Sequence, residues 1–215
     1  KTTMCGKLAN HLRKQGKKPM LAACDIYRPA AIKQLQVVGG QVGVEVFERG
    51  QGNPVEIAKE AIEYAHLRDV KVFVTMNTIV FEEEMEDMKK QLHKLNEIGA
   101  DAVIVQDLAV FEYAKSHFED MEVHGSTQMG IDDLEGTLLC KELGSDRVVL
   151  AREVSMDKVK EIRKEAQLPI EIFVHGALCV SHSGQCLFSS LVGGRSGNRG
   201  ACAQPCRLPD SHGKY

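Results

Sequence analysis

The sequence contains no Trp and no excess of charge of either sign. Its 215 residues include 27 Lys and Arg against 30 Asp and Glu, so the formal net charge is −3. This balance gives no electrostatic argument for a nucleic-acid or membrane partner, although a local basic patch can exist on a near-neutral protein. No apolar run approaches the about 20 residues that a membrane helix needs, and no signal-peptide pattern opens the chain. We therefore expect a cytoplasmic globular protein.

Cysteine, in contrast, is well represented and unevenly placed. The chain has seven cysteines, an odd number that does not suit a secreted disulfide framework. Four of them lie in "HGALCVSHSGQCLFSSLVGGRSGNRGACAQPC", residues 175–206. In a cytosolic chain, clustered cysteines more often bind metal or act chemically than cross-link. These four are Cys179, Cys186, Cys202 and Cys206.

Their spacing favours one kind of metal site over another. Zinc sites usually pair ligands two to four residues apart, twice, and only Cys202 and Cys206 approach that pattern. An iron–sulfur cluster needs four thiolates on loops that can wrap it, and five glycines between residues 184 and 200 supply such loops. Packed thiols and a Cys–His nucleophile, with His175 or His182 as base, remain alternatives. We expect the cysteines on helix or strand patterns to be core residues: Cys5, Cys24 and Cys140.

Short apolar runs alternate with amphipathic helical patterns along the chain. Residues 82–100, "EEEMEDMKKQLHKLNEIGA", place Met85, Met88, Leu92 and Leu95 on one helical face and end at a glycine. This alternation predicts βα units and a parallel sheet, in a barrel or in an open doubly wound form. The predicted strands are Pro19–Asp25, Val70–Asn77, Asp101–Asp107, Met121–Gln128, Asp146–Glu153 and Pro169–Gly176.

Polar side chains recur where the apolar runs end. In a parallel α/β structure the carboxyl ends of the strands meet at one edge, where active sites are built. A single polar strand end indicates only that a loop begins there, but five in succession favour a site. We therefore predict a catalytic site at this edge, with substrate oriented by His124, Gln128, Arg152, Glu153 and His175.

The first 65 residues contain two motifs of a nucleotide-binding domain. "KTT" at residues 1–3 is typical of the end of a phosphate loop, and "DIYRPAA" at residues 25–31 contains a D-x-Y-R-x-A-A motif. With "GQGNPVEIAKEAIEYA", residues 50–65, they resemble the GTPase domain of the signal recognition particle and its receptor. The resemblance implies nucleotide-binding roles for Lys1, Thr2, Asp25 and Arg28.

The chemistry of that GTPase family is incomplete in this chain. The glycines that would cradle the phosphates precede Lys1, and the D-T-A-G-R and T-K-x-D motifs are missing. Binding of GTP and Mg²⁺ would therefore be expected only if the N-terminal part were complete. GTPase activity of this chain is not expected.

From about residue 61 the motifs are of another kind. The longest of them is "EIFVHGALCVSHSGQCLFSS". The others are "VKVFVTMNT", "DAVIVQDLAV", "HGSTQMG", "DRVVLAREVS" and "GGRSGNRGACAQPCRLP". The motif "EIFVHGALCVSHSGQCLFSS" fits the pattern E-x-F-x-x-G-A-L-C followed, after four residues, by G-x-C. Over about 150 residues the chain resembles the collagenase-like peptidase family, number thirty-two of the unassigned peptidases.

This second resemblance implies a cofactor and an activity. Several members of the family carry a [4Fe–4S] cluster, which assigns Cys179, Cys186 and Cys202 as ligands, with Cys206 or a later cysteine as the fourth. Zinc is the alternative metal. The family includes proteins linked to hydroxylation of tRNA or rRNA bases or of quinone precursors, and proteins named as peptidases. RNA, a small aromatic molecule or a peptide is the implied substrate.

The two resemblances predict a composite chain. We expect a truncated GTPase-like βα fragment over residues 1–66 and a partial TIM-barrel-like array of parallel βα units with a Cys-rich loop over 67–215. The join falls in "EAIEYAH", residues 60–66, which suits either family. A chimeric or misassembled coding sequence is favoured over a natural fusion, and the ends of the chain suggest a fragment. The alternatives to an iron–sulfur enzyme are a nucleotide-binding fragment and an inactive chimera.

Overall fold

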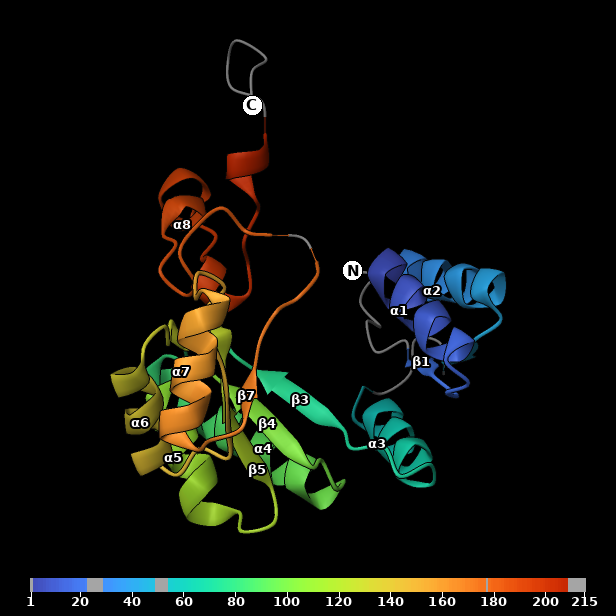
Figure 1. Cartoon of the computed structure of the whole chain (residues 1–215). Coiled ribbons are helices and arrows are strands. Elements are labelled where there is room, and N and C mark those ends of the chain that lie inside the picture. The colour runs from blue at the N-terminus through green and yellow to red at the C-terminus, as the bar shows by residue number, and fades with distance from the viewer. Residues whose placement is uncertain (1, 23–28, 49–53, 177, 209–215) are drawn as a thin grey trace. The chain divides into compact units, whose positions relative to one another are not determined.

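The computed structural model describes residues 2–22, 29–48, 54–176 and 178–208 (Figure 1). It contains two compact units. The first is built from residues 1–72 with 175–177, and the second from residues 73–174 with 178–215. The structural division at residue 72 lies a few residues beyond the expected boundary at residue 66, which stays a prediction.

The first unit is a small α/β assembly. Its two short strands pair in parallel, with Leu21 opposite Val46. The core of this unit consists of Ala9, Leu21, Ile32, Leu35 and Val44. Its elements are α1 (Thr2–Lys14), β1 (Met20–Ala22), α2 (Pro29–Val42), β2 (Glu45–Phe47) and α3 (Pro54–His66).

Two details of the first unit differ from the sequence-based expectations. Cys5 was predicted to lie in the core and is exposed. The physical reason is helical geometry, since α1 buries Gly6 and Ala9, and Cys5 falls outside the face that those two residues define. Strand β2 was not expected, because three residues are too few to show a clear alternation.

The second unit contains a five-stranded parallel sheet with the order β3-β4-β5-β6-β7. Each strand pairs with the next strand along the chain, and the order never reverses as it does in a doubly wound sheet. The predicted α/β fold is therefore confirmed, with the strand order of a partial TIM-barrel-like array. The strands are β3 (Phe73–Met76), β4 (Ala102–Val105), β5 (Glu122–Gly125), β6 (Arg147–Val149) and β7 (Ile170–Glu171).

Helices connect these strands, and a further helix follows the last one (Figure 1). Helix α4 buries Leu92 completely and half-buries Met85, Met88 and Leu95, the face that the sequence predicted. Gly99 follows its end in the left-handed conformation, with φ +81°. The helices are α4 (Met85–Glu97), α5 (Leu108–His117), α6 (Leu134–Glu142), α7 (Met156–Ala166) and α8 (Phe188–Gly193); the 3₁₀ turns are η1 (Glu82–Glu84), η2 (Thr127–Met129), η3 (Gly197–Arg199) and η4 (Pro205–Arg207).

The two faces of the sheet differ in chemistry. One face packs against α6 and α7, and its core includes Cys140, Val148, Leu150 and Ile162, so the prediction of a buried Cys140 is confirmed. The opposite face carries the alternate residues of each strand, among them several charged side chains. Since a core sheet face is ordinarily apolar, this polar face is a feature that needs explanation.

In the part of the chain that the structure describes, no helix is both long enough and apolar enough to cross a bilayer.

Candidate functional site

The four clustered cysteines lie on one segment of the second unit, residues 178–208, which we call the cysteine segment. Its own contacts fold it back on itself. The Arg207 guanidinium donates to the Leu178 carbonyl at 2.7 Å, and the Ala203 N–H donates to the Ser189 hydroxyl at 3.0 Å. The beginning and the end of the segment are thereby held together.

The thiols differ in their surroundings. Cys179, Cys202 and Cys206 are exposed, while Cys186 is half-buried. The Phe188 N–H and the Ser181 hydroxyl hydrogen-bond to the Cys186 sulfur, and these bonds lower the pKa of that thiol. The Cys202 sulfur accepts the Gln204 N–H at 3.4 Å. The thiolate of Cys186, the form in which cysteine binds metals, is therefore favoured.

A metal site requires that ligands converge as well as suit the metal. Thiolates suit iron and zinc, so the donor chemistry fits the expected cofactors. Among the described residues, however, no group of three or more His, Cys, Asp or Glu side chains is placed to hold a metal ion. We therefore derive no chemical step through a cluster, and the four-cysteine ligand set stays a prediction.

Arg152 and Glu153, which follow β6, fasten the start of the cysteine segment. The Arg152 guanidinium donates to the Cys179 carbonyl at 3.0 Å, the Ser181 carbonyl at 2.9 Å and the Ser183 hydroxyl at 3.1 Å. Glu153 Oε1 accepts the Ser183 N–H at 3.0 Å. These contacts give both predicted residues a positioning role toward the cysteine segment.

The charge state of Glu153 suits that role. Partial burial acts to raise the pKa of Glu153, but its own N–H, the Ser183 hydroxyl and the Arg152 guanidinium outweigh burial, and the pKa lies below its usual range. The carboxylate therefore remains charged and accepting at neutral pH. The Ser183 side chain that it holds is fully buried.

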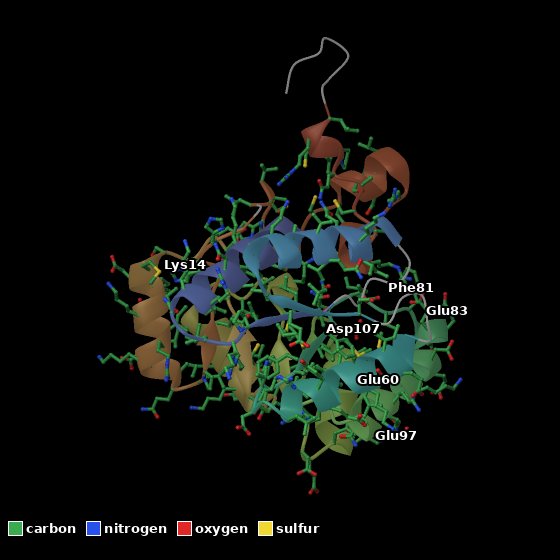
Figure 2. All side chains as sticks on the ribbon, turned by 90° about the vertical axis from the view of Figure 1, so that its right-hand side faces the viewer. Lys14, Glu60, Phe81, Glu83, Glu97 and Asp107 are labelled. Atoms are coloured by element: carbon green, nitrogen blue, oxygen red, sulfur yellow. The ribbon has the colours of Figure 1, made fainter. Side chains whose placement is uncertain are left out.

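A second arginine fastens the later part of the segment to the turn after β3. Arg199 donates to both oxygens of Glu84, at 2.6 and 2.9 Å, and to the Ile79 carbonyl at 2.9 Å. Its guanidinium lies 3.9 Å from the centre of the Phe81 ring. Figure 2 labels Phe81 and, near it, Glu83. The Ile79 N–H donates to the Asn198 carbonyl at 2.9 Å, so residues 79–84 and 198–199 are joined by backbone and side chain.

Glu84 is strongly affected by this pairing. The Arg199 guanidinium, helped by the Phe81 N–H, lowers the pKa of Glu84 to about 2. The bidentate geometry is the strongest form of an arginine–carboxylate pair. The cysteine segment is thus fastened at two points, one after β6 and one after β3, at the carboxyl ends of both strands.

Gln128 meets the cysteine segment through its backbone. A Cβ on Gly184 would stand 1.9 Å from the Gln128 carbonyl oxygen, and one on Gly130 would stand 3.1 Å from the Ser183 carbonyl oxygen. Both glycines have φ near +70°. The Gln106 amide donates to the same Gln128 carbonyl at 3.2 Å, which ties the turn after β5 to the end of β4.

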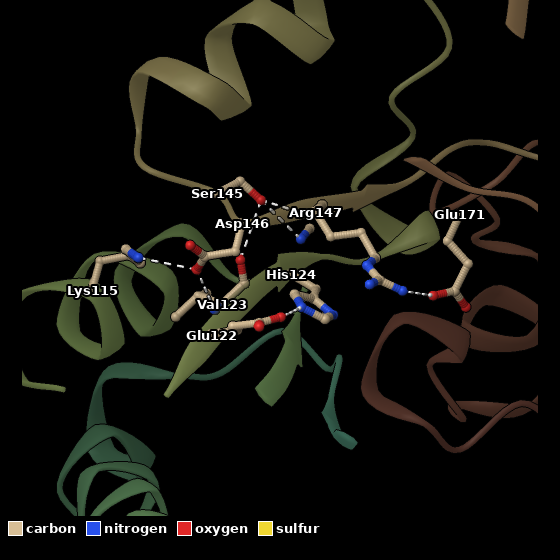
Figure 3. A network of polar contacts seen from close by, with 9 residues as sticks. Lys115, Glu122, Val123, His124, Ser145, Asp146, Arg147 and Glu171 are labelled. Carbon is tan, nitrogen blue, oxygen red and sulfur yellow. Dashed lines mark hydrogen bonds and ion pairs between the residues drawn. The ribbon is translucent and has the colours of Figure 1, made fainter. Parts of the chain in front are cut away.

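His124 is the second-last residue of β5, inside the predicted strand, and it is fully buried; its predicted role in orienting substrate stays a prediction. Its Nε2 is 2.9 Å from Glu122 Oε2, and its ring meets the Phe73 ring edge-on at 4.9 Å between centres. Beside it, Arg147 pairs with Glu171 at 3.6 Å. Figure 3 shows these four polar side chains in sequence across β5, β6 and β7.

The remaining predicted residues are His175 and the nucleotide-binding group. His175 is exposed and belongs to the first unit. Lys1, Asp25, Arg28 and Cys24, and the side chain of Thr2, lie outside the described residues. The nucleotide-binding predictions at these positions stay predictions.

Sequence reasoning missed four residues that the structure brings to the site: Glu84, Ser183, Arg199 and Arg147. Arg199 and Glu84 are 115 positions apart, and neither lies in a pattern that pairs them. The sequence offered one local signal for Arg199. This arginine stands among glycines in a Cys-rich segment, where few nearby side chains can pair with a guanidinium.

Named relatives of this chain modify RNA. It is 38% identical over 188 residues to the 23S rRNA 5-hydroxycytidine C2501 synthase of Escherichia coli (strain K12), covering 85% of this chain and 28% of that protein. It is 35% identical over 153 residues to tRNA hydroxylation protein P1 of Bacillus subtilis (strain 168), covering 71% of this chain and 36% of that protein. The chain thus spans about a third of the length of these relatives.

Solved structures resemble the chain more loosely. The U32 peptidase Mk0906 matches with a TM-score of 0.48 and 17% identity, over 59% of this chain and 53% of the other. Cell division protein FtsY of Thermotoga maritima matches with a TM-score of 0.37 and 25% identity, over 82% of this chain and 58% of the other. Both families suggested by the sequence therefore appear, but overlaps this partial carry no argument about the site.

The family itself is shown by its sequence model. The match to the family described as Peptidase family U32 extends over residues 45–211, which is most of the chain. It includes the five-stranded sheet, both arginine fastenings and all four clustered cysteines. The chain belongs to Peptidase family U32.

Proposed function

We propose that this chain is the part of an RNA-hydroxylating protein that carries its cysteine segment, and that its substrate is a pyrimidine base of tRNA or rRNA. The observation that supports this proposal most is the 38% identity to an rRNA 5-hydroxycytidine synthase over 85% of the chain. The proposal covers RNA, rather than a quinone precursor or a peptide, because the relatives described above are named for RNA products. A cytoplasmic location, where RNA is found, belongs to the same proposal.

The structure supports a role for the cysteine segment at the carboxyl ends of the strands. Arg152 and Arg199 hold it there by contacts to Ser183 and Glu84. Active sites of parallel α/β proteins form at this edge. We propose that Cys179, Cys186, Cys202 and Cys206 carry a [4Fe–4S] cluster, with zinc as the alternative; a cluster would supply redox chemistry or a Lewis-acidic iron.

The proposal is tested by looking for the product in RNA. The full chain is expressed in a bacterial strain that lacks its rRNA and tRNA hydroxylation relatives, and digested RNA is analysed by mass spectrometry for nucleosides that have gained one oxygen. We expect hydroxylated cytidine or uridine with the native chain. The Cys186→Ser variant should lose the product, whereas Cys140→Ser, a change at a buried thiol on the helix-packed face, should retain it in proportion to the folded protein. Absence of any hydroxylated nucleoside with the native chain would contradict the proposal.

A further inference from the structure

The structure leaves an unusual group of buried polar atoms without partners. Folded proteins satisfy nearly all such atoms, so each exception calls for an explanation. Among the described residues, the buried side-chain nitrogen and oxygen atoms that lack a hydrogen-bond partner are Gln106 Oε1, His124 Nδ1, Arg147 Nε and Ser190 Oγ. The first three come from neighbouring parts of one sheet.

These three side chains share one face of that sheet. His124 is the register partner of Ile104 on β4 and of Arg147 on β6, and register partners in a parallel sheet point to the same side. Gln106 lies two residues beyond Ile104, so the alternation of the strand returns it to this side. Adjacent strands lie about 4.8 Å apart and two residues span about 6.6 Å, so the three side chains rise from an area about 12 Å across.

The chemistry of the three atoms restricts what can satisfy them together. Gln106 Oε1 only accepts, and its amide nitrogen already donates to Gln128. Arg147 Nε only donates. With Nε2 of His124 donating to the Glu122 carboxylate, Nδ1 of a neutral ring accepts. The complementary ligand therefore offers at least one N–H or O–H donor and one carbonyl-type acceptor.

This requirement separates two classes of ligand. A carboxylate or phosphate would satisfy Arg147 and leave Gln106 Oε1 without a donor. The amide-like edge of a pyrimidine offers donors and acceptors side by side, and enzymes that act on bases read this edge by hydrogen bonds. A heterocyclic base therefore fits the three atoms better than an anion does.

Phe73 provides the aromatic surface that such a base would need. Its ring lies 4.9 Å from the His124 ring and 5.4 Å from the Arg147 guanidinium carbon. The approach is lined by Arg147 and Glu171, whose side chains are 33% and 43% exposed. His124 is fully buried, so a ligand reaches Nδ1 only if a neighbouring side chain moves, and the adjacent Phe73 ring supplies an aromatic face for stacking.

We infer that the polar face of β4, β5 and β6 binds the pyrimidine base of the substrate through Gln106, His124 and Arg147, with Phe73 stacking on it. Glu122 orients His124 and fixes which ring nitrogen faces the base. This inference deepens the proposed function and rests on it for the identity of the ligand.

The test is a titration of the full chain, labelled with ¹⁵N-histidine, with cytidine and with uridine, followed by NMR. The His124 signals, assigned by their loss in His124→Gln, should shift and saturate with at least one nucleoside. The signals of His93 and His117, which lie in an exposed aromatic group, should stay in place. Unchanged His124 signals at saturating nucleoside would overturn the inference and leave trapped water as the partner of these atoms.

Variants provide a second arm of the test. Gln106→Leu and Arg147→Met should each weaken nucleoside binding by about tenfold, since each leaves a polar atom of the base unpaired. Ser190→Ala removes the fourth unpaired atom, on α8, and should leave binding unchanged. Equal binding by all three variants would count against the site.

The two proposals can fail separately. If the native chain hydroxylates RNA while Gln106→Leu and Arg147→Met bind and react like the native chain, the base site is wrong and the proposed function stands. If nucleosides shift His124 but no RNA product forms, the base site stands and the proposed function is wrong.

Discussion

Gly184 lies at the closest contact between the cysteine segment and the sheet. It has φ +72°, and a Cβ there would stand 1.9 Å from the Gln128 carbonyl oxygen. No side chain can occupy that space without moving the backbone of one partner. A single glycine thus decides how closely the cysteine segment approaches the end of β5.

Replacing Gly184 by Ala should therefore be costly. We expect a loss of more than about 2 kcal/mol in the free energy of unfolding, because a left-handed conformation and a backbone clash add together. Urea denaturation measures it. Gly193→Ala is the matched control, since nothing lies within 4 Å of its Cβ position, and it should be neutral. Equal effects of the two changes would contradict the contact.

The Glu84–Arg199 pair predicts a defined dependence on pH. The pKa of Glu84 is lowered from 4.5 to about 2, so the folded state favours the charged carboxylate. Its stabilising contribution is fully present above pH 4.5 and is lost as the pH falls toward 2. Hydrogen exchange of the Ile79 amide, which donates to Asn198, should therefore accelerate beyond its intrinsic pH trend in this window.

Two variants serve to attribute that effect. Glu84→Gln should remove the extra acceleration between pH 4.5 and 2. Asp87→Asn alters an exposed pair with Lys90 on the adjacent turn and should leave it in place. An acceleration that persists in Glu84→Gln would assign the pH dependence to another group.

Among the elements, the cysteine segment depends on side chains from outside it. Arg152 alone bonds two of its backbone carbonyls and one of its hydroxyls. Hydrogen bonds from a charged donor are the stronger kind, and here they replace the regular backbone ladder that a segment with one short helix lacks. The order of the segment therefore follows from the strand ends that hold it.

Removing Arg152 should release the start of the segment. We expect Arg152→Ala to increase the rate of chymotrypsin cleavage after Leu178 or Leu187 by at least about tenfold, because three charge-assisted bonds are lost. Arg163→Ala, on the exposed side of α7, should cleave at the native rate. A native cleavage rate in Arg152→Ala would show that the other contacts suffice to hold the segment.

The elements also show what the sequence can and cannot predict. The parallel sheet and the buried face of α4 follow from local periodicity, which a chain displays in its own order. Strand β2 was not predicted, because it is only three residues long. The contact between Arg199 and Glu84 was not predicted, because the two residues are 115 positions apart and no local pattern links them.

His124 illustrates a limit of a different kind. The strand-end pattern identified it as a site residue, and the structure places it one residue before the end of β5, on the polar side of the sheet. Alternation along a strand tells which residues share a face but not where pairing stops. Arg147, its neighbour on β6, was missed because it begins a strand rather than ending one.

At the level of the whole molecule, the first unit raises the question of nucleotide binding. If the chain bound GTP with Mg²⁺, ligand at a hundred times its dissociation constant would add about 2.7 kcal/mol to stability. Because residues 1–215 contain neither the D-T-A-G-R motif nor the T-K-x-D motif, we expect no shift in the melting temperature with GTP or GDP and Mg²⁺. A rise that grows with GTP concentration would favour the nucleotide-binding alternative.

Membership in Peptidase family U32 and the identity to RNA hydroxylation proteins support the same proposed function, hydroxylation of RNA. The sheet has a polar face, on which we propose that a base binds, and the cysteine segment is fastened at the carboxyl ends of β3 and β6. We propose that the fastened cysteines carry an iron–sulfur cluster.

Anaerobic reconstitution of the full chain, followed by iron and sulfide analysis and visible absorption, tests that claim most directly. We predict about four iron and four sulfide per chain, with a brown colour that Cys186→Ser loses and Cys140→Ser retains. A chain that stays colourless after reconstitution, or that binds one equivalent of zinc instead, would contradict it.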